Sequence, residues 1–136
     1  MSNLGLGVMI GILGGNEETV NAVRSSIGRT ISGISLKGDV VCIAFTDRTE
    51  LRIRDDGQSC CESRYVTTDD NLTHIKNTVL LNIEIVEAAN GSMQQDDDVH
   101  EIQFLRIHTD KGVVVFQTHN EHNGYYGGFY IKAWFS

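Results

Sequence analysis

Hydrophobic and polar residues alternate along most of the chain after residue 29, and this alternation is the pattern of β-strands with one buried face. In the first half, the runs 30–37, 40–46 and 50–55 are separated by short turns rich in Gly and Asp. Such spacing predicts an antiparallel meander of three strands. Within the third run, Arg52 and Arg54 alternate with apolar residues, so they should point away from the core.

The second half continues this pattern. Strands are predicted over residues 79–85, 99–109, 113–119 and 129–135. The stretch NGSMQQDDD, between the first two of these strands, is polar and acidic and predicts a solvated loop. The stretch DGQSCCESRYVT, after the meander, has no period and predicts a structured loop.

Two short helices are predicted outside these strands. In the first, Asn16 is a possible cap, Glu17 and Glu18 lie at the positive end of the helix dipole, and the helix should end near Gly28. The second is predicted in DDNLTHIKN, with a cap before it. The fold class is therefore α+β, an antiparallel sheet of about six strands with two short helices. Residues 1–136 form a single domain, in which 1–29 are a glycine-rich arm and N-terminal helix and 30–136 are the β-rich core.

The charge and the cysteine content of the chain limit the partners that it could bind and indicate the cellular compartment. The 136 residues carry a formal charge of −7, which disfavours duplex nucleic acid but leaves small anions possible where arginines cluster. Three cysteines, an odd number, indicate a reducing compartment. The apolar opening stretch has no Lys or Arg before Arg24 and is too short to span a membrane. These features predict a cytoplasmic protein that does not bind a membrane.

The stretch HNEHNG suggests a metal site or a catalytic site, but no known sequence pattern for such a site is present. His119 and His122 could bind zinc together with Cys60, Cys61 or His108, yet the chain lacks paired C-x-x-C or helical H-E-x-x-H ligands. A histidine-rich nuclease site would need a following helix, and a strand is predicted instead. Adjacent cysteines are also poor candidates for a nucleophile. We therefore predict no metal, no cofactor and no catalytic residue.

Arginine, asparagine and tyrosine side chains near two predicted loops could form a nucleotide pocket. Arginine binds phosphates as a two-pronged donor, asparagine pairs with base edges, and aromatic rings stack on bases. A plainer alternative is that the tyrosines cover the open end of the sheet while the glycines allow the turn. The candidate ligand-binding residues are Arg52, Arg54, Arg64, Tyr65, His119, Asn120, His122, Asn123, Tyr125 and Tyr126.

Two motifs resemble a family of small phage and prophage proteins that carry a domain of unknown function. The first, C-C-E-x-x-Y, covers residues 60–65, and the second, N-G-Y-Y, covers residues 123–126. The resemblance runs from about residue 31 to residue 131. The chain departs from the family pattern in its long glycine-rich N-terminus and in the Gly-Gly after the tyrosines.

This family is similar to the Thoeris anti-defence sponges, which bind a cyclised ADP-ribose signal, or in some cases cyclic oligonucleotides, without degrading them. The resemblance implies a phage-encoded homo-oligomer that sequesters a small nucleotide-derived ligand in the cytoplasm of an infected bacterial host. The residues 118–129 would then act as a lid over the ligand. Two alternatives stay open: an inhibitor that binds a host protein, and a metal- or cysteine-dependent hydrolase.

Overall fold

The computed structural model describes residues 17–57, 62–95, 98–122 and 129–136, and for residues 87–95 and 98 it describes the backbone alone. One α-helix, one turn of 3-10 helix and eight strands make up this described part. In chain order they are α2 (Glu17–Ser26), β1 (Thr30–Lys37), β2 (Val40–Phe45), β3 (Glu50–Asp55), β4 (Ser63–Thr67), η1 (Leu72–His74), β5 (Thr78–Gln95), β6 (Asp98–Thr109), β7 (Gly112–His122) and β8 (Ile131–Phe135).

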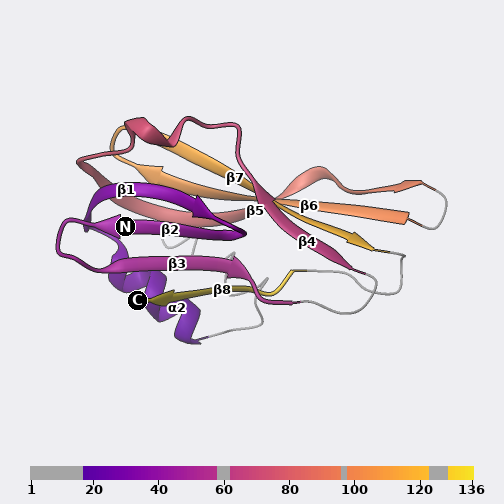
Figure 1. Ribbon diagram of the computed structural model, residues 1–136, viewed down its shortest axis with the longest axis horizontal. Helices are drawn as coiled ribbons and strands as arrows, with labels where there is room; N and C mark the ends of the chain where they lie inside the picture. The colour runs from indigo at the N-terminus through magenta and orange to yellow at the C-terminus, as the bar shows by residue number, and fades with distance from the viewer. Residues whose placement is uncertain (1–16, 58–61, 96–97, 123–128) are drawn as a thin grey trace.

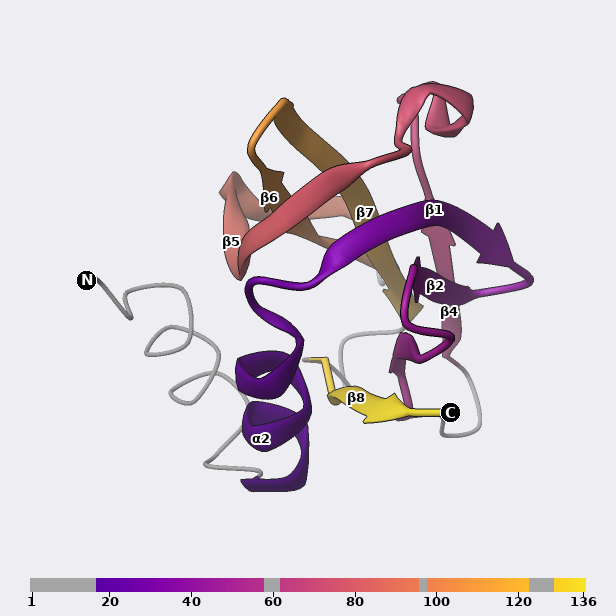
Figure 2. The same cartoon turned by 90° about the vertical axis from the view of Figure 1, so that its left-hand side faces the viewer.

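The strands form one antiparallel sheet that is folded over on itself. Its order is β4-β7-β6-β5-β1-β2-β3-β8, so β4 and β8 are the two edges. Only a short pairing, Thr30 with Val79 and Ile31 with Thr78, joins β1 to β5. The chain bends at this narrow join, which brings β1, β2, β3 and β8 to face β4, β5, β6 and β7 (Figures 1 and 2).

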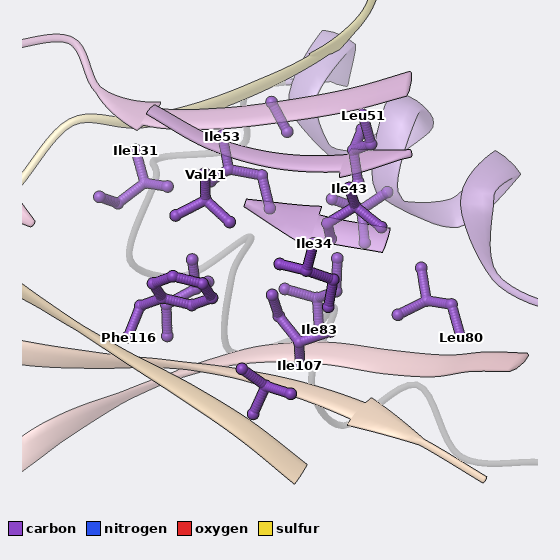
Figure 3. Close-up of a cluster of buried hydrophobic side chains, with 14 of the residues drawn as sticks. Ile34, Val41, Ile43, Leu51, Ile53, Leu80, Ile83, Ile107, Phe116 and Ile131 are labelled. Atoms are coloured by element: carbon purple, nitrogen blue, oxygen red, sulfur yellow. The ribbon is translucent and has the colours of Figure 1, made fainter. Parts of the chain in front are cut away.

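Apolar side chains from both halves of the sheet fill the space between them. Figure 3 shows Val41, Ile53 and Ile131 on one side, with Phe116 and Ile107 opposite them. All five are buried, and Phe116 and Ile107 are fully so. The period-2 alternation along each strand produces this arrangement, because it sends every second side chain into the same layer.

The helix α2 lies against the edge strand β8 (Figure 2). Val20 and Val23 on one helix face are buried. The backbone N–H of Ala133 in β8 donates a hydrogen bond of 3.2 Å to the Thr19 hydroxyl. Because this bond occupies a strand N–H that would otherwise face outward, α2 protects part of the β8 edge.

The antiparallel β architecture was predicted correctly, but the predicted number of elements was wrong. The class α+β fits only loosely, because the described part has one α-helix beside an eight-stranded sheet. The sheet has eight strands rather than about six. The second predicted helix is a single 3-10 turn, Leu72–His74, capped by Asn71, whose side chain accepts a hydrogen bond from the N–H of Thr73. None of the three side chains of this turn is fully buried. The packing that would stabilise a longer α-helix is therefore missing here.

Two stretches predicted as loops are strands. The end of DGQSCCESRYVT forms β4, and β5 continues from the predicted strand through most of NGSMQQDDD as far as Gln95. Figure 1 shows the β5 and β6 hairpin reaching beyond the ends of β1, β2 and β3. Pairing with β6 holds this extension, since Ser92 lies opposite Glu101 and Gln95 opposite Asp98.

Candidate ligand-binding site

A buried ion cluster joins the edge strand β4 to the other half of the folded sheet. Nη1 of Arg64 lies 3.0 Å from Oδ1 and 2.8 Å from Oδ2 of Asp55, at the end of β3. Nη2 of the same side chain lies 2.7 Å from Oε2 of Glu62. The side chains are 5%, 6% and 1% exposed, respectively. Charge-assisted bonds to two carboxylates therefore fix the guanidinium in place.

The backbone around this cluster packs tightly onto the guanidinium. The N–H of Tyr130 donates to Oδ1 of Asp55 over 3.0 Å, and the guanidinium lies 5.5 Å from the centre of the Tyr130 ring. A methyl group at Gly57 would overlap the Tyr130 ring and lie 3.0 Å from Cζ of Arg64. Gly57 is thus the residue that lets the chain pass so close to the cluster.

Burial lowers the pKa of the Arg64 guanidinium, but the hydrogen bonds that it donates to Asp55 and Glu62 outweigh this effect, so the pKa is raised. Arg64 is consequently always charged, and its positive charge is shared by two carboxylates. Both of these acids are buried with it. A phosphate could approach Arg64 only by displacing a carboxylate that is already well bound.

Polar side chains continue from this cluster along the inner face of β7. Going toward the end of the strand, the buried positions change from Phe116 to Thr118, Asn120 and His122. Nδ2 of Asn120 donates to Oε2 of Glu62 over 3.1 Å. Oε1 of Glu101 lies 2.7 Å from Nε2 of His122. This end of the folded sheet is thus polar inside, where the rest of the layer is apolar.

A second cluster lies on the outer face of the same sheet, where β4, β7 and β6 run side by side. The ring of Tyr65 stacks on that of His119, with centroids 4.4 Å apart and planes within 8°. Nδ1 of His119 lies 2.9 Å from Nε2 of His100. The hydroxyl of Tyr65 donates a short hydrogen bond to Glu121. Residues 65 and 119 therefore belong to one cluster, while Arg64 and Asn120 face the opposite side.

Two pKa values are shifted in the outer cluster. Burial and the neighbouring His100 lower the pKa of His119, against a smaller opposing effect of Glu121. The hydrogen bond to Glu121, with burial adding to it, raises the pKa of Tyr65 to about 12. At neutral pH these effects favour a neutral His119 and a protonated Tyr65.

We predict that Glu121→Gln brings the pKa of Tyr65 back toward its ordinary value near 10. In the folded protein Tyr65 keeps a proton that the unfolded chain loses above about pH 10, so the stability from this pair falls as the pH rises from about 10 to about 12. The measurement is tyrosinate absorbance in alkaline titration, with Tyr65→Phe identifying the signal of this residue. A Tyr65 signal that titrates at the same pH with and without Glu121 would contradict the assignment.

Arg54 and Arg52 lie on the outward side of β3, as their alternation predicted, and so face away from Arg64. Arg54 pairs with Asp56, and its guanidinium lies 5.6 Å from the Trp134 ring. Arg52 pairs with Glu50 over 2.6 Å. The three arginines of the predicted pocket therefore do not converge.

A hollow of about 480 Å³ opens beside Arg54. It is formed by β3, β8 and the first turn of α2, and it is lined by Glu18, Thr19, Arg54, Asp56, Lys132, Ala133 and Trp134. Lys132 reaches Asp56 over 3.1 Å, so this carboxylate holds both cations of the hollow. Both cations are about half exposed. They can therefore turn toward a bound ligand at little cost.

Several predicted residues lie outside the described part of the chain. These are Asn123, Tyr125 and Tyr126 of the N-G-Y-Y motif, the cysteine pair Cys60 and Cys61, and the glycine-rich arm up to Asn16. Their predicted roles in a lid or in ligand binding stay predictions. Glu62, which belongs to the first motif, and His122, which precedes the second, both belong to the polar inner end.

Three residues of these sites were not selected from the sequence: Asp55, Glu62 and Trp134. Asp55 and Glu62 stand next to the DGQSCC stretch, and their position close to Arg64 in the chain was the only available signal. Trp134 could have been placed with Arg54 and Lys132, because period-2 alternation puts residues 132 and 134 on the outward face of β8.

Within the described residues, no group of three or more His, Cys, Asp or Glu side chains is already positioned to hold a metal ion. No helix in this part of the chain is long and apolar enough to cross a membrane.

Comparison with known proteins identifies the family. No curated protein and no solved structure matches the chain significantly. A family model, described as a domain of unknown function, DUF7448, matches residues 24–131. The match begins in α2 and ends in β8, so it includes the ion cluster and the outer histidines. Of the seven residues that line the hollow, it includes Arg54 and Asp56. The chain belongs to the DUF7448 family.

Proposed function

We propose that this protein is a phage-encoded anti-defence protein that binds a nucleotide immune signal, a cyclic ADP-ribose isomer or a cyclic oligonucleotide, and sequesters it without cleavage. The observation that carries the proposal is the hollow beside Trp134. An indole and two half-exposed cations line one space, together with the carboxylates of Glu18 and Asp56. Its volume of about 480 Å³ falls within the range of small-molecule sites.

The hollow offers the contacts that a nucleotide needs. A base can stack on the indole of Trp134, and a phosphate can draw Arg54 and Lys132 away from Asp56. Exchanging the carboxylate partner for a phosphate keeps both cations paired, and water can solvate the released carboxylate of Asp56, which is 29% exposed. The carboxylate of Glu18 stands at the helix side, where a hydroxyl group of a ribose would find an acceptor.

The ion cluster has a supporting role in this proposal. Arg64 is committed to Asp55 and Glu62, and Asp55 follows directly after Arg54 in β3. Fixing Asp55 therefore fixes the strand end that presents Arg54. The same cluster also includes Glu62 of the first motif and, through Glu62, contacts Asn120 of β7. We expect a homo-oligomer, because neighbouring subunits can enclose a ligand that a small chain leaves partly open.

We predict that Trp134→Ala weakens nucleotide binding about 5- to 100-fold, the loss expected for one stacked base. Arg54→Ala should weaken binding by a similar factor and reduce its dependence on salt. The measurement is isothermal titration calorimetry with cyclic ADP-ribose isomers and cyclic dinucleotides. Arg106→Ala is the matched control, since Arg106 is also a half-exposed arginine but lies on β6, outside the hollow.

Equal binding by the wild type and both hollow variants would exclude this site even if a ligand is captured elsewhere. Turnover of the ligand during the titration would support the hydrolase alternative. The second alternative, inhibition of a host protein, is favoured by one observation: Tyr130 is 60% exposed, next to the ion cluster. Exposed tyrosines are frequent anchors of protein interfaces, and this alternative predicts that no nucleotide binds at all.

A further inference from the structure

Two histidine nitrogens face each other on the outer surface of the sheet, apart from the hollow and from the ion cluster. His100 of β6 and His119 of β7 stand on neighbouring strands (Figure 1), with 2.9 Å between Nε2 of His100 and Nδ1 of His119. Two nitrogens bound to one tetrahedral metal ion at about 2.0–2.1 Å are only a few tenths of an ångström farther apart. The two nitrogens therefore have nearly the spacing of adjacent ligands, and a tilt of each ring would direct both lone pairs at one ion.

The hydrogen bonds around His119 determine its tautomer. The Thr67 hydroxyl has a single proton, which it donates to Oε1 of Gln117 over 3.0 Å. The same oxygen lies 2.8 Å from Nε2 of His119, so it must accept a proton from that nitrogen. Nδ1 of His119 consequently carries a lone pair, which points toward His100. Metal-binding histidines typically have this arrangement, with one nitrogen on the metal and the other donating to a fixed acceptor.

A carboxylate stands beside the two histidines. Glu121 of β7 lies directly opposite His100 in the strand register, so the two side chains project from the same face next to each other. Glu121 is exposed, and its carboxylate is held by the hydroxyl of Tyr65. A change of rotamer would bring it to the histidine pair, and the Tyr65 hydroxyl would then turn to water. The ring of Tyr65 stacks on His119 and holds that imidazole in its orientation.

We propose that His100 Nε2 and His119 Nδ1, with the carboxylate of Glu121 as third ligand, bind a divalent late transition metal ion such as Zn²⁺, Ni²⁺ or Cu²⁺. Imidazole and carboxylate together suit these metals. On binding, His100 keeps its one proton but carries it on Nδ1, because the metal takes Nε2. The negative charge of Glu121 and the net charge of −7 both favour a bound cation.

The test is titration of the full chain, freed of metal by a chelator, with Zn²⁺ and Ni²⁺ by calorimetry and with Cu²⁺ by electron paramagnetic resonance. We expect one saturable site and a Cu²⁺ spectrum with two nitrogen ligands. His100→Gln and His119→Gln should each abolish that site. Thr67→Val, which removes the acceptor behind His119, should weaken it by about 10-fold or more. Tyr65→Phe should retain it, because the hydroxyl is not a ligand.

His108→Gln is the control, because His108 is on the same strand as His100 but bonds to Glu84 over 2.7 Å. A wild type without saturable binding would overturn the proposal. Undiminished binding by the double variant His100→Gln, His119→Gln would also overturn it, because the metal would then be held by other residues. Loss of binding in the single variants counts only if their unfolding temperatures stay close to that of the wild type.

Discussion

Replacing Arg64 by methionine is expected to lower the free energy of unfolding by about 3–5 kcal/mol, which is the cost of removing one partner from a buried ion pair. Methionine keeps much of the apolar stem but leaves Asp55 and Glu62 without their cation. Both carboxylates are almost fully buried, so water can replace the guanidinium only poorly. This loss of stability should exceed the loss from breaking any exposed ion pair in the described part of the chain.

Urea unfolding of Arg64→Met and of Arg52→Met provides the comparison. Arg52 also bonds to a carboxylate, that of Glu50, but its side chain is 40% exposed. An exposed pair contributes about 1 kcal/mol at most, so this control should be close to the wild type. Adding Glu62→Gln to Arg64→Met should recover part of the loss, since one buried charge is then removed. Equal stability of the two arginine variants would show that the cluster does not hold β4 in place.

Phe116→Ala is expected to destabilise the fold by a similar amount, about 3–5 kcal/mol, the range for truncating a buried phenylalanine. Phe116 is fully buried in β7 and faces Val41 and Ile131 of the opposite half (Figure 3). The strands around it are held by their own ladders and cannot easily collapse into the space that the ring leaves. A cavity would therefore remain between the two halves of the sheet.

Thermal and urea unfolding of Phe116→Ala test this expectation, with Val113→Ala as the control on the same strand. Val113 is 48% exposed, so its truncation should change stability by no more than about 0.5 kcal/mol. If Phe116→Ala also changes stability so little, the two halves do not pack through this ring.

Much of the sheet could be predicted because its strands alternate cleanly. The runs that became β1, β2 and β3 have apolar residues at every inward position or nearly so, and their turns contain Gly or Asp. The strand β4 was not predicted, because Arg64 occupies one of its inward positions and interrupts the apolar alternation. The C-terminal part of β5 was not predicted for a related reason. Its polar residues form a strand by pairing with β6, and no local sequence pattern indicates such a pairing.

The sequence predicted which types of residue form the candidate site, but not which of them contact one another. Tyr65 and His119 were both selected from the sequence, and the structure stacks them. Arg64 was selected for phosphate, yet the folded sheet gives it Asp55 and Glu62 as partners. The choice between a phosphate and a buried carboxylate depends on long-range packing. Asp55 and Arg64 are nine positions apart in the chain, and Gly57 leaves room for the guanidinium where the two meet.

The most direct test of ligand sequestration is to incubate the purified protein with cyclic ADP-ribose isomers and cyclic oligonucleotides, remove the free ligand, denature the protein by heat and identify what is released. The account predicts one intact ligand recovered in near-stoichiometric amount from the wild type, and much less from Trp134→Ala. Release of a chemically altered ligand would indicate an enzyme. Recovery of no ligand from any member of the panel would contradict the proposed function.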